Sequence, residues 1–451
     1  MNNVLFPPIQ ISVRRTNFII IFRHQYQHQM ASAEKAIDFF PFWEESSSFF
    51  LNECSLDLDL STPRETSKTL WYGGLRNTGN TCFVNAVLQA LSSSHSFILF
   101  LKEHNESKVS SELLQVLSSL NCSLSTAHTH STVQLLQSLP SSRWAPDTEQ
   151  QDVHEFYLAL LDALEDHKSI SESIIESPFT GLLVSSIWCC VCHEFQTTRS
   201  MPFVYLELSL PLSSIIYPAS DSSVLSLHSL LDDYCSVEKL DNVYCQRCSL
   251  EATATQLSRL LQHSPRSPAP ASLNKTGLPE FTLSQTSSST LKPSLAQALR
   301  IRFEMVISAL QQYPVKDSDF ERLKPPRLVA VQKEKQTKLL QLPECLTIHV
   351  NRSQYDPVQR TAVKNYVPVS FPEQLSLQKY VQTDSYADDT SYRLISVVTH
   401  QGNHSFGHYT AFRRVDNGWI ETSDGHVRDV SLNEVLEQPS VVMLFYELYQ
   451  R

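Results

Sequence analysis

The chain has 451 residues, 41% of them hydrophobic and 18% charged, which is enough to bury a substantial core in two or three subdomains. Its net charge of −11 argues against nucleic acid as the main partner and fits a neutral or basic protein partner. The ten cysteines include two C-x-x-C pairs, and no convincing secretory signal precedes them. We therefore expect a reducing compartment and bound metal rather than disulfides.

Residues 1–69 form an N-terminal extension without lasting periodicity. The best apolar run there, Phe18–Phe22, has five residues, far fewer than the ~20 that span a membrane, so we expect no transmembrane segment. Residues 1–33 contain no acid and three arginines, which is faintly similar to a transit sequence. A disordered tail is an alternative, and so is an upstream start with Met30 as a second start site.

The stretch GGLRNTGNTCFVNAVLQAL at 73–91 puts Cys82 directly after a polar turn and directly before an apolar pattern with helical spacing. Thr78, Asn80 and Thr81 are candidate caps for this helix. Because unpaired N–H groups and the helix dipole favour an anion, we expect Cys82 to be held toward its thiolate form. The alternative is a small buried core cysteine.

Glycine is rare in this chain, with nine in 451 residues. Seven of the nine lie in two short windows, one around Cys82 and one around His408. They are Gly73, Gly74, Gly79, Gly402, Gly407, Gly418 and Gly425. Glycine marks places where the backbone bends sharply or another group approaches closely. A cysteine in one window and a histidine in the other indicate a Cys/His pair brought together by folding.

Helical patterns dominate from about residue 75 to 170. After the Cys82 helix they fall at Glu112–Leu120, Thr132–Leu139 and Gln150–Asp166. The acidic and amide-rich start of the last helix suits the helix dipole, and the same side chains can line a binding channel. The sequence predicts a helical lobe.

Short strands follow from about residue 178, including the alternating stretch Phe203–Leu210. Residues 255–332, rich in Ser, Pro and Thr but with a helical stretch at 294–313, predict a partly disordered low-complexity insertion. Five more strands are expected at Leu346–Arg352, Tyr392–His400, His408–Val415, Gly418–Thr422 and Val441–Leu448. The prediction is an α+β fold in which the helical lobe faces a largely antiparallel sheet, as in papain-like cysteine proteases.

Two cysteine pairs, Cys189 with Cys192 and Cys245 with Cys248, supply four soft ligands of the kind that hold structural Zn²⁺. Cys190 makes the register of the first pair ambiguous. We prefer Cys189, because an x-x spacing lets both sulfurs face one ion. The alternative is a set of unrelated free cysteines.

Several of these stretches, in this order, resemble motifs of the ubiquitin-specific proteases. They are GLRNTGNTCFVNAVLQAL, EQQDVHEFYLALLDAL, the paired C-x-x-C motifs, LPECLTIHVNR, GHYTAF and GWIETSDGHV. The resemblance covers about 71–449 apart from the insertion. It implies a catalytic domain at 70–451 with thumb, palm and fingers, and a ubiquitin tail that enters between thumb and palm. The implied boundaries are a helical thumb at about 71–175, zinc-bearing β fingers at about 180–255 and 333–345, and an antiparallel β palm at about 346–451.

The same resemblance implies a role for each matching residue. Cys82 would be the nucleophile and His408 the general base. Asn77 would stabilise the oxyanion, a contribution of ~2.7–4 kcal/mol for one such donor. Residues that would hold the ubiquitin tail are Gln150, Gln151, Asp152, Gly407 and Tyr409. The zinc would be structural, with no cofactor for catalysis.

The third member of the catalytic triad departs from the usual pattern. Most of the family has Asp or Asn where this chain has Ser423, followed by an Asp that matches Asp424. The serine is similar to that of the mitochondrial outer-membrane member, which has a Cys-His-Ser triad. Serine carries no charge, so it would stabilise an imidazolium less. Asp424 is the alternative third member and could compensate for the missing charge, but adjacent strand residues point to opposite faces, so Ser423 and Asp424 cannot orient the ring equally.

The expected activity is that of a thiol isopeptidase, which hydrolyses the bond between the ubiquitin C-terminal glycine and a lysine through an acyl-enzyme. The expected partners are ubiquitin and ubiquitinated proteins. Alternatives are a weak or inactive ubiquitin-binding scaffold and a protease for a ubiquitin-like modifier. The expected location is the cytoplasm, with the mitochondrial outer membrane or the nucleus as further options.

Overall fold

The computed structural model describes residues 72–122, 128–144, 151–165, 177–211, 224–262, 293–356, 360–382, 390–403, 406–416 and 418–449. All of them belong to one compact unit made of Glu65–His167 and Ile175–Arg451. The predicted extension at 1–69 lies outside the described residues, as does the Ser- and Pro-rich part of the predicted insertion at 263–292.

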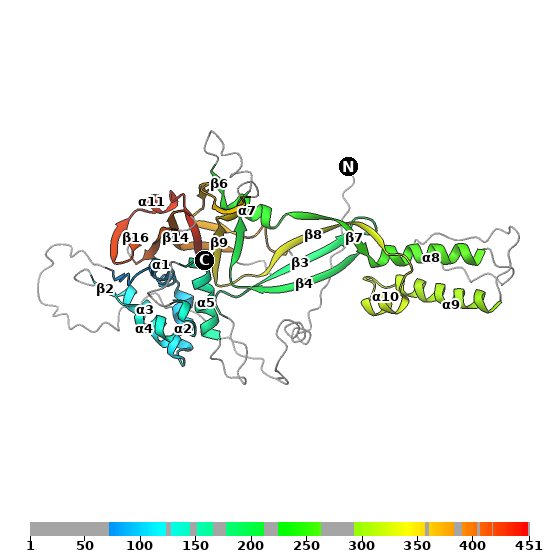
Figure 1. Cartoon of the computed structure of the whole chain (residues 1–451), viewed down its shortest axis with the longest axis horizontal. Coiled ribbons are helices and arrows are strands. Elements are labelled where there is room, and N and C mark those ends of the chain that lie inside the picture. The colour runs from blue at the N-terminus through cyan, green and yellow to red at the C-terminus, as the bar shows by residue number, and fades with distance from the viewer. Residues whose placement is uncertain are drawn as a thin grey trace, which may run out of the picture. The chain divides into compact units, whose positions relative to one another are not determined.

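A helical lobe follows the first short strand (Figure 1). Its helices are α1 (Cys82–Leu91), α2 (His95–Glu103), α3 (Lys108–Asn121), α4 (Val133–Ser138) and α5 (Val153–Glu165), with a 3₁₀ turn, η3, at Ser142–Trp144. The helical patterns predicted at 112–120, 132–139 and 150–166 are confirmed as α3, α4 and α5. Sequence patterns missed α2, whose apolar residues run together without a clear face. Among the described residues, no single helix has the length and apolar character to cross a membrane, and only the bent pair of α1 and α2 meets those two criteria together.

An eight-stranded sheet carries the C-terminal part of the chain. Its strands are β5 (Leu206–Ser209), β9 (Cys345–Asn351), β13 (Gln374–Ser376), β14 (Ser391–Gly402), β15 (Gly407–Val415), β16 (Gly418–Ser423), β17 (His426–Val430) and β18 (Val441–Leu448). Their order is β17-β16-β15-β14-β18-β9-β5, with β13 paired to β14, and only the β5–β9 pair is parallel. The five strands predicted near the C-terminus are confirmed as β9, β14, β15, β16 and β18.

Smaller elements surround this sheet. They are β1 (Gly74–Leu75), which pairs with β2 (Thr129–His130), β6 (Leu225–Ser226), which pairs with β12 (Val369–Ser370), the hairpin of β10 (Ser353–Asp356) and β11 (Thr361–Lys364), and the helices α7 (Leu227–Tyr234) and α11 (Leu432–Leu436). Strand β1 contacts β17, and Lys364 at the end of β11 hydrogen-bonds His400 of β14. These elements flank the site described below.

Helix α1 packs between the rest of the lobe and the sheet, where it contacts α5, β14 and β15. All ten of its residues are buried, and the ring of Phe83 meets those of Trp144 and Phe156 at centroid distances of 6.1 and 5.6 Å. Burial on every side fixes α1 as a rigid support, so the residue at its N-terminus has a defined position relative to β15.

Arg413 of β15 joins the sheet to two helices and is fully buried. Its guanidinium donates to Gln89 Oε1 at 2.8 Å, to Asn121 Oδ1 at 2.9 Å and to the carbonyl oxygen of Leu120 at 2.6 Å. Burial lowers the pKa of Arg413 to about 10, which still leaves it protonated at neutral pH. One protonated guanidinium therefore donates hydrogen bonds to all three of these acceptors.

Replacing Arg413 by methionine should lower the free energy of unfolding by about 3–5 kcal/mol, since each buried acceptor left without a donor costs ~1–3 kcal/mol. Urea denaturation of the two proteins would measure this difference. Arg428→Met is the matched control, because Arg428 makes its ion pairs at the surface and should change stability little. Equal effects of the two substitutions would contradict the assigned role of Arg413.

A four-stranded antiparallel sheet forms the fingers. Its strands are β3 (Gly181–Cys189), β4 (Phe195–Phe203), β7 (Val237–Cys245) and β8 (Val329–Gln341), in the order β4-β3-β8-β7. The strand predicted at Phe203–Leu210 is confirmed over part of its length, as β5, but it is not one continuous strand. The chain ends β4 at Phe203 and starts β5 at Leu206 in the other sheet, so the two halves of that stretch belong to different sheets, which local alternation cannot distinguish.

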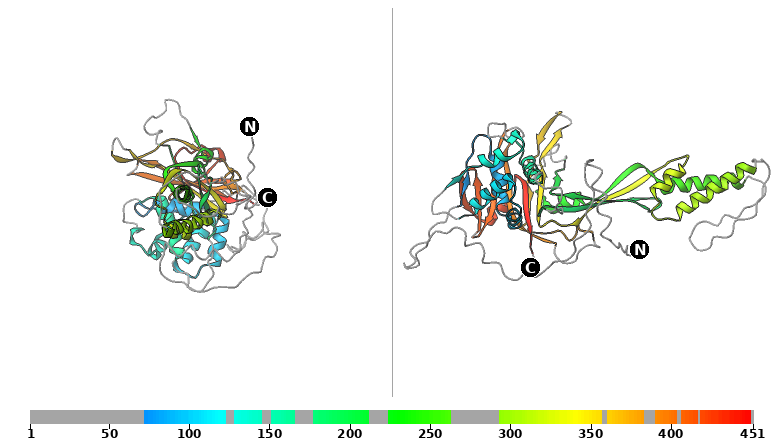
Figure 2. Two further views of the ribbon diagram at one scale, coloured as in Figure 1. Left: turned by 90° about the vertical axis from the view of Figure 1, so that its right-hand side faces the viewer. Right: turned by 90° about the horizontal axis from the view of Figure 1, so that it is seen from below.

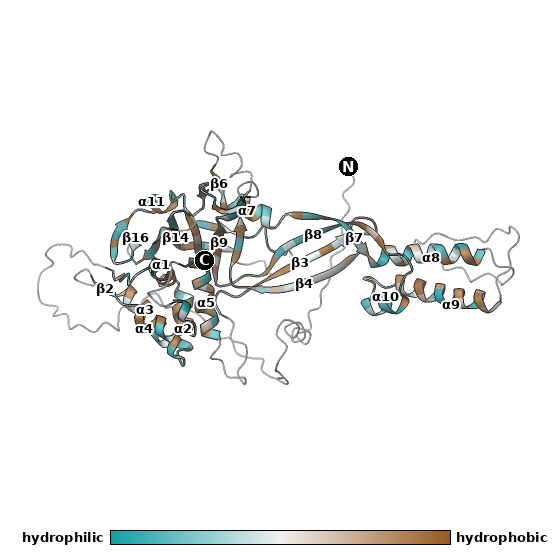
Figure 3. Ribbon diagram, viewed as in Figure 1, coloured by the Kyte–Doolittle hydropathy of each residue, from teal (hydrophilic) through white to brown (hydrophobic). Residues whose placement is uncertain are grey.

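Within the predicted insertion at 255–332, the helical stretch expected at 294–313 is confirmed as α9, and more of the segment is folded than the sequence predicts. Helix α8 (Gln246–Gln262) continues into it, and α9 (Pro293–Leu310) and α10 (Asp317–Leu323) follow. Apolar residues recur along α8 and α9 (Figure 3), which lie side by side (Figure 2). Leu250 and Leu257 of α8 share a core with Val306 and Leu310 of α9, because the two helices bury these faces against each other beyond the finger strands.

Candidate active site

Cys82 is the first residue of α1 and is only 5% exposed. Thr81 occupies the N-cap position, but no side chain caps the helix; its hydroxyl instead accepts from the main-chain N–H of Thr78 at 3.2 Å. The capping role predicted for Thr78, Asn80 and Thr81 is therefore wrong for the two threonines. The main-chain N–H of Tyr409 on β15 donates to the Cys82 sulfur, so the thiol faces the strand that carries His408.

The expectation that Cys82 is held as a thiolate is wrong for this structure. Burial raises the pKa of the Cys82 thiol, and the negative charge of Asp424 raises it further. The N–H groups at the helix start act in the other direction, but they do not offset the loss of water around the sulfur. The site at rest holds a neutral thiol, which needs a base to ionise it.

His408 and Ser423 lie on the neighbouring strands β15 and β16. The Nε2 atom of His408 hydrogen-bonds the hydroxyl of Ser423 at 2.8 Å. This contact uses one ring nitrogen and leaves Nδ1 as the atom that can exchange a proton with another group. Among the described residues, Ser423 is thus a side-chain partner of this imidazole.

Asp424 follows Ser423 in the turn between β16 and β17, with a positive φ of 52°. Its carboxylate accepts from two side-chain amides, Asn77 Nδ2 at 2.9 Å and Asn85 Nδ2 at 2.7 Å, and its carbonyl accepts from the N–H of Leu75 at 2.9 Å. Its side-chain hydrogen bonds in the described part of the chain go to the α1 side of the site, and none of them goes to the imidazole. The turn therefore gives the two adjacent side chains different partners: Ser423 contacts the imidazole of His408, and Asp424 contacts the amides of Asn77 and Asn85.

Asn77 is oriented from both ends of its amide. Its oxygen accepts from the N–H of Gly79 at 3.1 Å and from the N–H and hydroxyl of Thr81, both at 3.3 Å. Its nitrogen carries two hydrogens and donates one of them in a hydrogen bond to the Asp424 carboxylate. The second N–H is the donor that this loop can offer beside Cys82.

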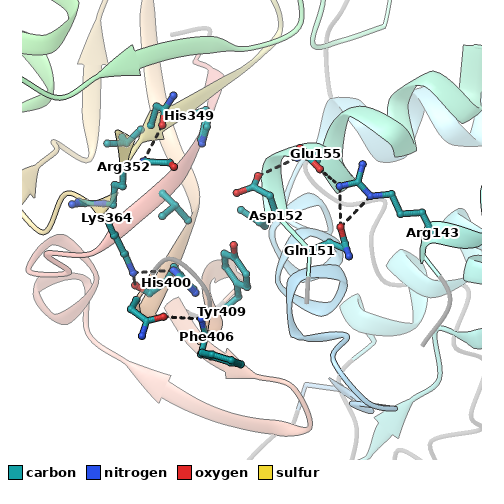
Figure 4. Close-up of a pocket in the computed structure, with 16 residues that line it drawn as sticks. Arg143, Gln151, Asp152, Glu155, His349, Arg352, Lys364, His400, Phe406 and Tyr409 are labelled. Carbon is teal, nitrogen blue, oxygen red and sulfur yellow. Dashed lines mark hydrogen bonds and ion pairs between the residues drawn. The ribbon is translucent and has the colours of Figure 1, made fainter. Parts of the chain in front are cut away.

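A pocket opens between the start of α5 and the large sheet (Figure 4). On the α5 side, Asp152 accepts from the N–H groups of His154 at 2.8 Å and of Glu155 at 3.2 Å, so one of its oxygens caps the helix. Arg143 forms an ion pair with Glu155 and donates to Gln151. Of the three predicted tail-binding residues on this wall, Gln151 and Asp152 line the pocket, and Gln150 lies outside the described residues.

The opposite wall carries Tyr409, whose ring stacks on that of His400 with centroids 4.4 Å apart. Gly407 lies directly against this histidine, because a Cβ added at Gly407 would stand 2.1 Å from His400 Nε2. Any other residue at this position would displace the imidazole. Phe406 precedes this glycine, lines the pocket and is 77% exposed.

The four predicted zinc ligands gather at the end of the fingers. The sulfurs of Cys189, Cys192, Cys245 and Cys248 all lie within 4.8 Å of one another, with Cys189 to Cys248 at 3.7 Å and Cys192 to Cys245 at 3.6 Å. Tetrahedral zinc with Zn–S bonds of ~2.3 Å needs sulfurs ~3.8 Å apart. The set includes Cys189 and excludes Cys190, as the x-x spacing predicts.

The chemistry of these cysteines also fits a metal ion. Burial and the neighbouring sulfurs raise the pKa of the Cys192 thiol to about 12, and burial raises that of Cys248 as well. Four crowded sulfurs can therefore be thiolates together only when a cation neutralises them. The donor set is all sulfur, which suits zinc.

The fold and the site together define a class of protein. A cysteine at the start of a buried helix, presented to a histidine strand of an antiparallel sheet, is the arrangement of papain-like thiol hydrolases, and the α+β thumb, palm and fingers architecture is confirmed. The model of the family "Ubiquitin carboxyl-terminal hydrolase" matches residues 73–446, so the chain belongs to this family and is a cysteine-type deubiquitinase.

Curated relatives span most of the chain at about a quarter identity. Ubiquitin carboxyl-terminal hydrolase 22 from Bos taurus is 26% identical over 421 residues, covering 84% of this chain and 68% of that protein. Ubiquitin carboxyl-terminal hydrolase 30 from Rattus norvegicus is 25% identical over 445 residues, covering 83% and 84%. Among solved structures, the Ubp8/Sgf11/Sus1/Sgf73 deubiquitinase module of SAGA bound to ubiquitin aldehyde is similar in fold, with a TM-score of 0.56, 20% identity, and coverage of 84% of this chain and 70% of that one.

Sequence reasoning missed two residues that build the site, Asn85 and His400. Asn85 is one of two buried amide residues on the largely apolar helix α1, and its amide donates to Asp424. Gln89, one turn later, is buried in the same way and binds Arg413. Two buried amides four residues apart were a signal that this helix face meets polar partners rather than a plain hydrophobic core.

Proposed function

We propose that the chain hydrolyses the isopeptide bond between the ubiquitin C-terminal glycine and a lysine, with Cys82 as nucleophile, His408 as base and Ser423 as the residue that orients His408. The observation that carries this proposal is the approach of β15 to the N-terminus of α1, where the Tyr409 N–H reaches the Cys82 sulfur one residue after His408. The hydrogen bond between His408 Nε2 and Ser423 supports the assignment of the third residue.

The neutral thiol decides the order of proton transfers. Because Ser423 engages Nε2, His408 Nδ1 takes the proton of Cys82 as the sulfur attacks the carbonyl carbon of the terminal glycine. The protonated imidazole then gives this proton to the lysine nitrogen as the C–N bond breaks. A thioester remains on Cys82, and water activated by His408 hydrolyses it to release ubiquitin.

Negative charge on the carbonyl oxygen needs a donor, and we assign this role to Asn77. The amide is preorganised, since its oxygen is held by the loop and one N–H by Asp424. Fixed donors of this kind stabilise an oxyanion without reorganising during the reaction. Asp424 acts through Asn77 and is a positioning residue.

The ubiquitin tail would lie in the pocket between α5 and the sheet. The carboxylates of Asp152 and Glu155 on the α5 wall suit a tail that bears arginines, and Arg143 holds Glu155 in place. Gln151, Gly407 and Tyr409 complete the assigned tail-binding set, together with Gln150. Gly407 makes room for the imidazole of His400 on this wall, since a Cβ there would stand 2.1 Å from Nε2.

We further propose that the four clustered cysteines hold one structural Zn²⁺ in the fingers, and that the chain acts on ubiquitin and ubiquitinated proteins as partners. The serine in third place favours the branch of the family with a Cys-His-Ser triad. The 3.6 and 3.7 Å sulfur separations support the metal, and the Ser423 contact supports the branch. The zinc would stabilise the finger tip and has no open position for catalysis.

Replacing Cys82 by serine should abolish labelling by a ubiquitin bearing a C-terminal electrophile, because the hydroxyl of serine is a much weaker nucleophile than the thiol. The measurement is the mass shift of the intact, reduced protein. Cys122→Ser is the matched control, since Cys122 lies in the same lobe and forms no disulfide, and it should leave labelling unchanged. Wild-type protein that binds ubiquitin but is not labelled would indicate a ubiquitin-binding scaffold. Labelling only by a probe built on a ubiquitin-like modifier would identify that modifier, and not ubiquitin, as the substrate.

A further inference from the structure

His400 is held in one protonation state by a neighbouring lysine. The ammonium of Lys364, at the end of β11, lies 2.8 Å from His400 Nδ1 and donates to the carbonyl oxygens of His400 and Gly402, both at 2.9 Å. An ammonium group has hydrogens but no lone pair, so Nδ1 must be the acceptor in this contact. The imidazole is therefore neutral, with its proton on Nε2.

The surroundings keep both groups in these states at neutral pH. Burial and the charge of Lys364 lower the pKa of His400 to about 4, so protonation of the ring is disfavoured. Burial and the charge of Arg352 lower the pKa of Lys364 to about 8, which leaves the ammonium mostly protonated at pH 7. The stacked ring of Tyr409 fixes the plane of the imidazole. Asp152 and His408 also act on this ring, with opposite effects on its pKa.

The remaining N–H of His400 is on Nε2, and its ring lines the pocket between α5 and the sheet. Nε2 lies against Gly407, where a Cβ would stand only 2.1 Å from it, so glycine is what lets the ring take this place, and among the described residues no hydrogen bond to Nε2 is found. Figure 4 shows His400 between Lys364 and Tyr409 on the wall opposite Asp152. The carboxylates on that opposite wall accept hydrogen bonds, whereas His400 donates one.

We propose that His400 is a substrate-binding residue that donates its Nε2–H to a main-chain carbonyl of the ubiquitin tail as the tail passes Gly407, and that Lys364 is the positioning residue that selects this tautomer. The inference rests on the proposed function in one respect, that the tail occupies this cleft. An extended peptide presents its carbonyls along its edge, so it needs donors as well as the acceptors supplied by α5.

Steady-state hydrolysis of a fluorogenic ubiquitin C-terminal amide tests the donor. His400→Leu should raise KM about five- to ten-fold, the effect of losing one hydrogen bond, and leave kcat within about two-fold, which also shows that the variant is folded. His400→Gln places an amide donor near Nε2 and should recover most of the loss. His228→Leu, an exposed histidine on α7, is the matched control. Lys364→Met should raise KM less than His400→Leu does. Lys364→Arg keeps the positive charge and should return KM to the wild-type value.

A second readout does not depend on turnover. In full-length protein labelled with ¹⁵N-histidine, the imidazole of His400 should carry its proton on Nε2 and remain neutral down to pH 5. In Lys364→Met, both tautomers should appear and the pKa of His400 should rise. A wild-type ring protonated on Nδ1, or an unchanged KM in an active His400→Leu variant, would overturn this inference alone. Absence of turnover by wild-type protein would overturn the proposed function with it.

Discussion

Replacing Asp424 by alanine is expected to lower kcat/KM about 10²- to 10³-fold, whereas Ser423→Ala should lower it only about two- to twelve-fold. Asp424 positions the Asn77 amide, and one oxyanion donor is worth ~2.7–4 kcal/mol. Ser423 contributes a single hydrogen bond to His408, worth ~0.5–1.5 kcal/mol. Removing the Asp424 charge should also ease ionisation of Cys82, since that charge raises its pKa, but the lost donor is the larger effect.

A double-mutant cycle identifies the route of this effect. If Asp424 acts through Asn77, the double variant Asn77→Ala/Asp424→Ala should be about as active as either single variant, because both remove the same donor. Asp429→Ala removes an exposed carboxylate from the neighbouring strand β17 and serves as the control. Additive losses, or a larger loss in Ser423→Ala than in Asp424→Ala, would contradict the assignment.

Purified protein is expected to contain about one zinc ion per chain, and Cys245→Ser should lose it together with the folded tip of the fingers. Structural zinc sites in small peptides contribute an apparent ~10–16 kcal/mol to folding, far more than this short sheet can recover by other contacts. Metal analysis and limited proteolysis measure the two effects. Activity toward ubiquitin substrates should fall as well, because the tip would no longer be ordered.

The neighbouring cysteine provides a close control for the metal site. Cys190 is adjacent to Cys189 but lies outside the sulfur cluster, so Cys190→Ser should keep both the zinc and the protease resistance. A strong chelator should reproduce the Cys245→Ser phenotype in wild-type protein. Full zinc content in Cys245→Ser would show that a different ligand set binds the metal.

Local patterns predicted those parts of the fold that depend on local physics. Strand β18 is a nearly continuous apolar run, and α5 repeats its apolar residues with helical spacing. Paired cysteines at fixed spacing predicted the sulfur cluster. Two glycine-rich windows indicated the approach of Cys82 to the strand of His408, although the two residues are far apart in the chain.

Features that depend on tertiary contacts were beyond these patterns. The stretch around Phe203–Leu210 is divided between β4 and β5 of two sheets, and the helix predicted at 294–313 packs against α8, a partner that local spacing does not report. The ionisation state of Cys82 depends on burial by β15, which a helix pattern does not report. The Asp-Gly pair at 424–425 predicted a turn, and Asp424 does adopt a positive φ, but the division of roles between Ser423 and Asp424 depends on which partners the two side chains reach across that turn.

The Arg413 cluster has a consequence for how the protein is made. Asn121 and Arg413 are separated by 292 residues, so at ~5–20 residues per second a ribosome needs about 15–60 s to deliver the guanidinium after the α3 carbonyl groups have emerged. Throughout that interval the nascent helices lack both their cation and the sheet that covers α1. Newborn chains should therefore depend on chaperones until translation is nearly complete, and truncations before β15 should aggregate rather than form a soluble helical lobe.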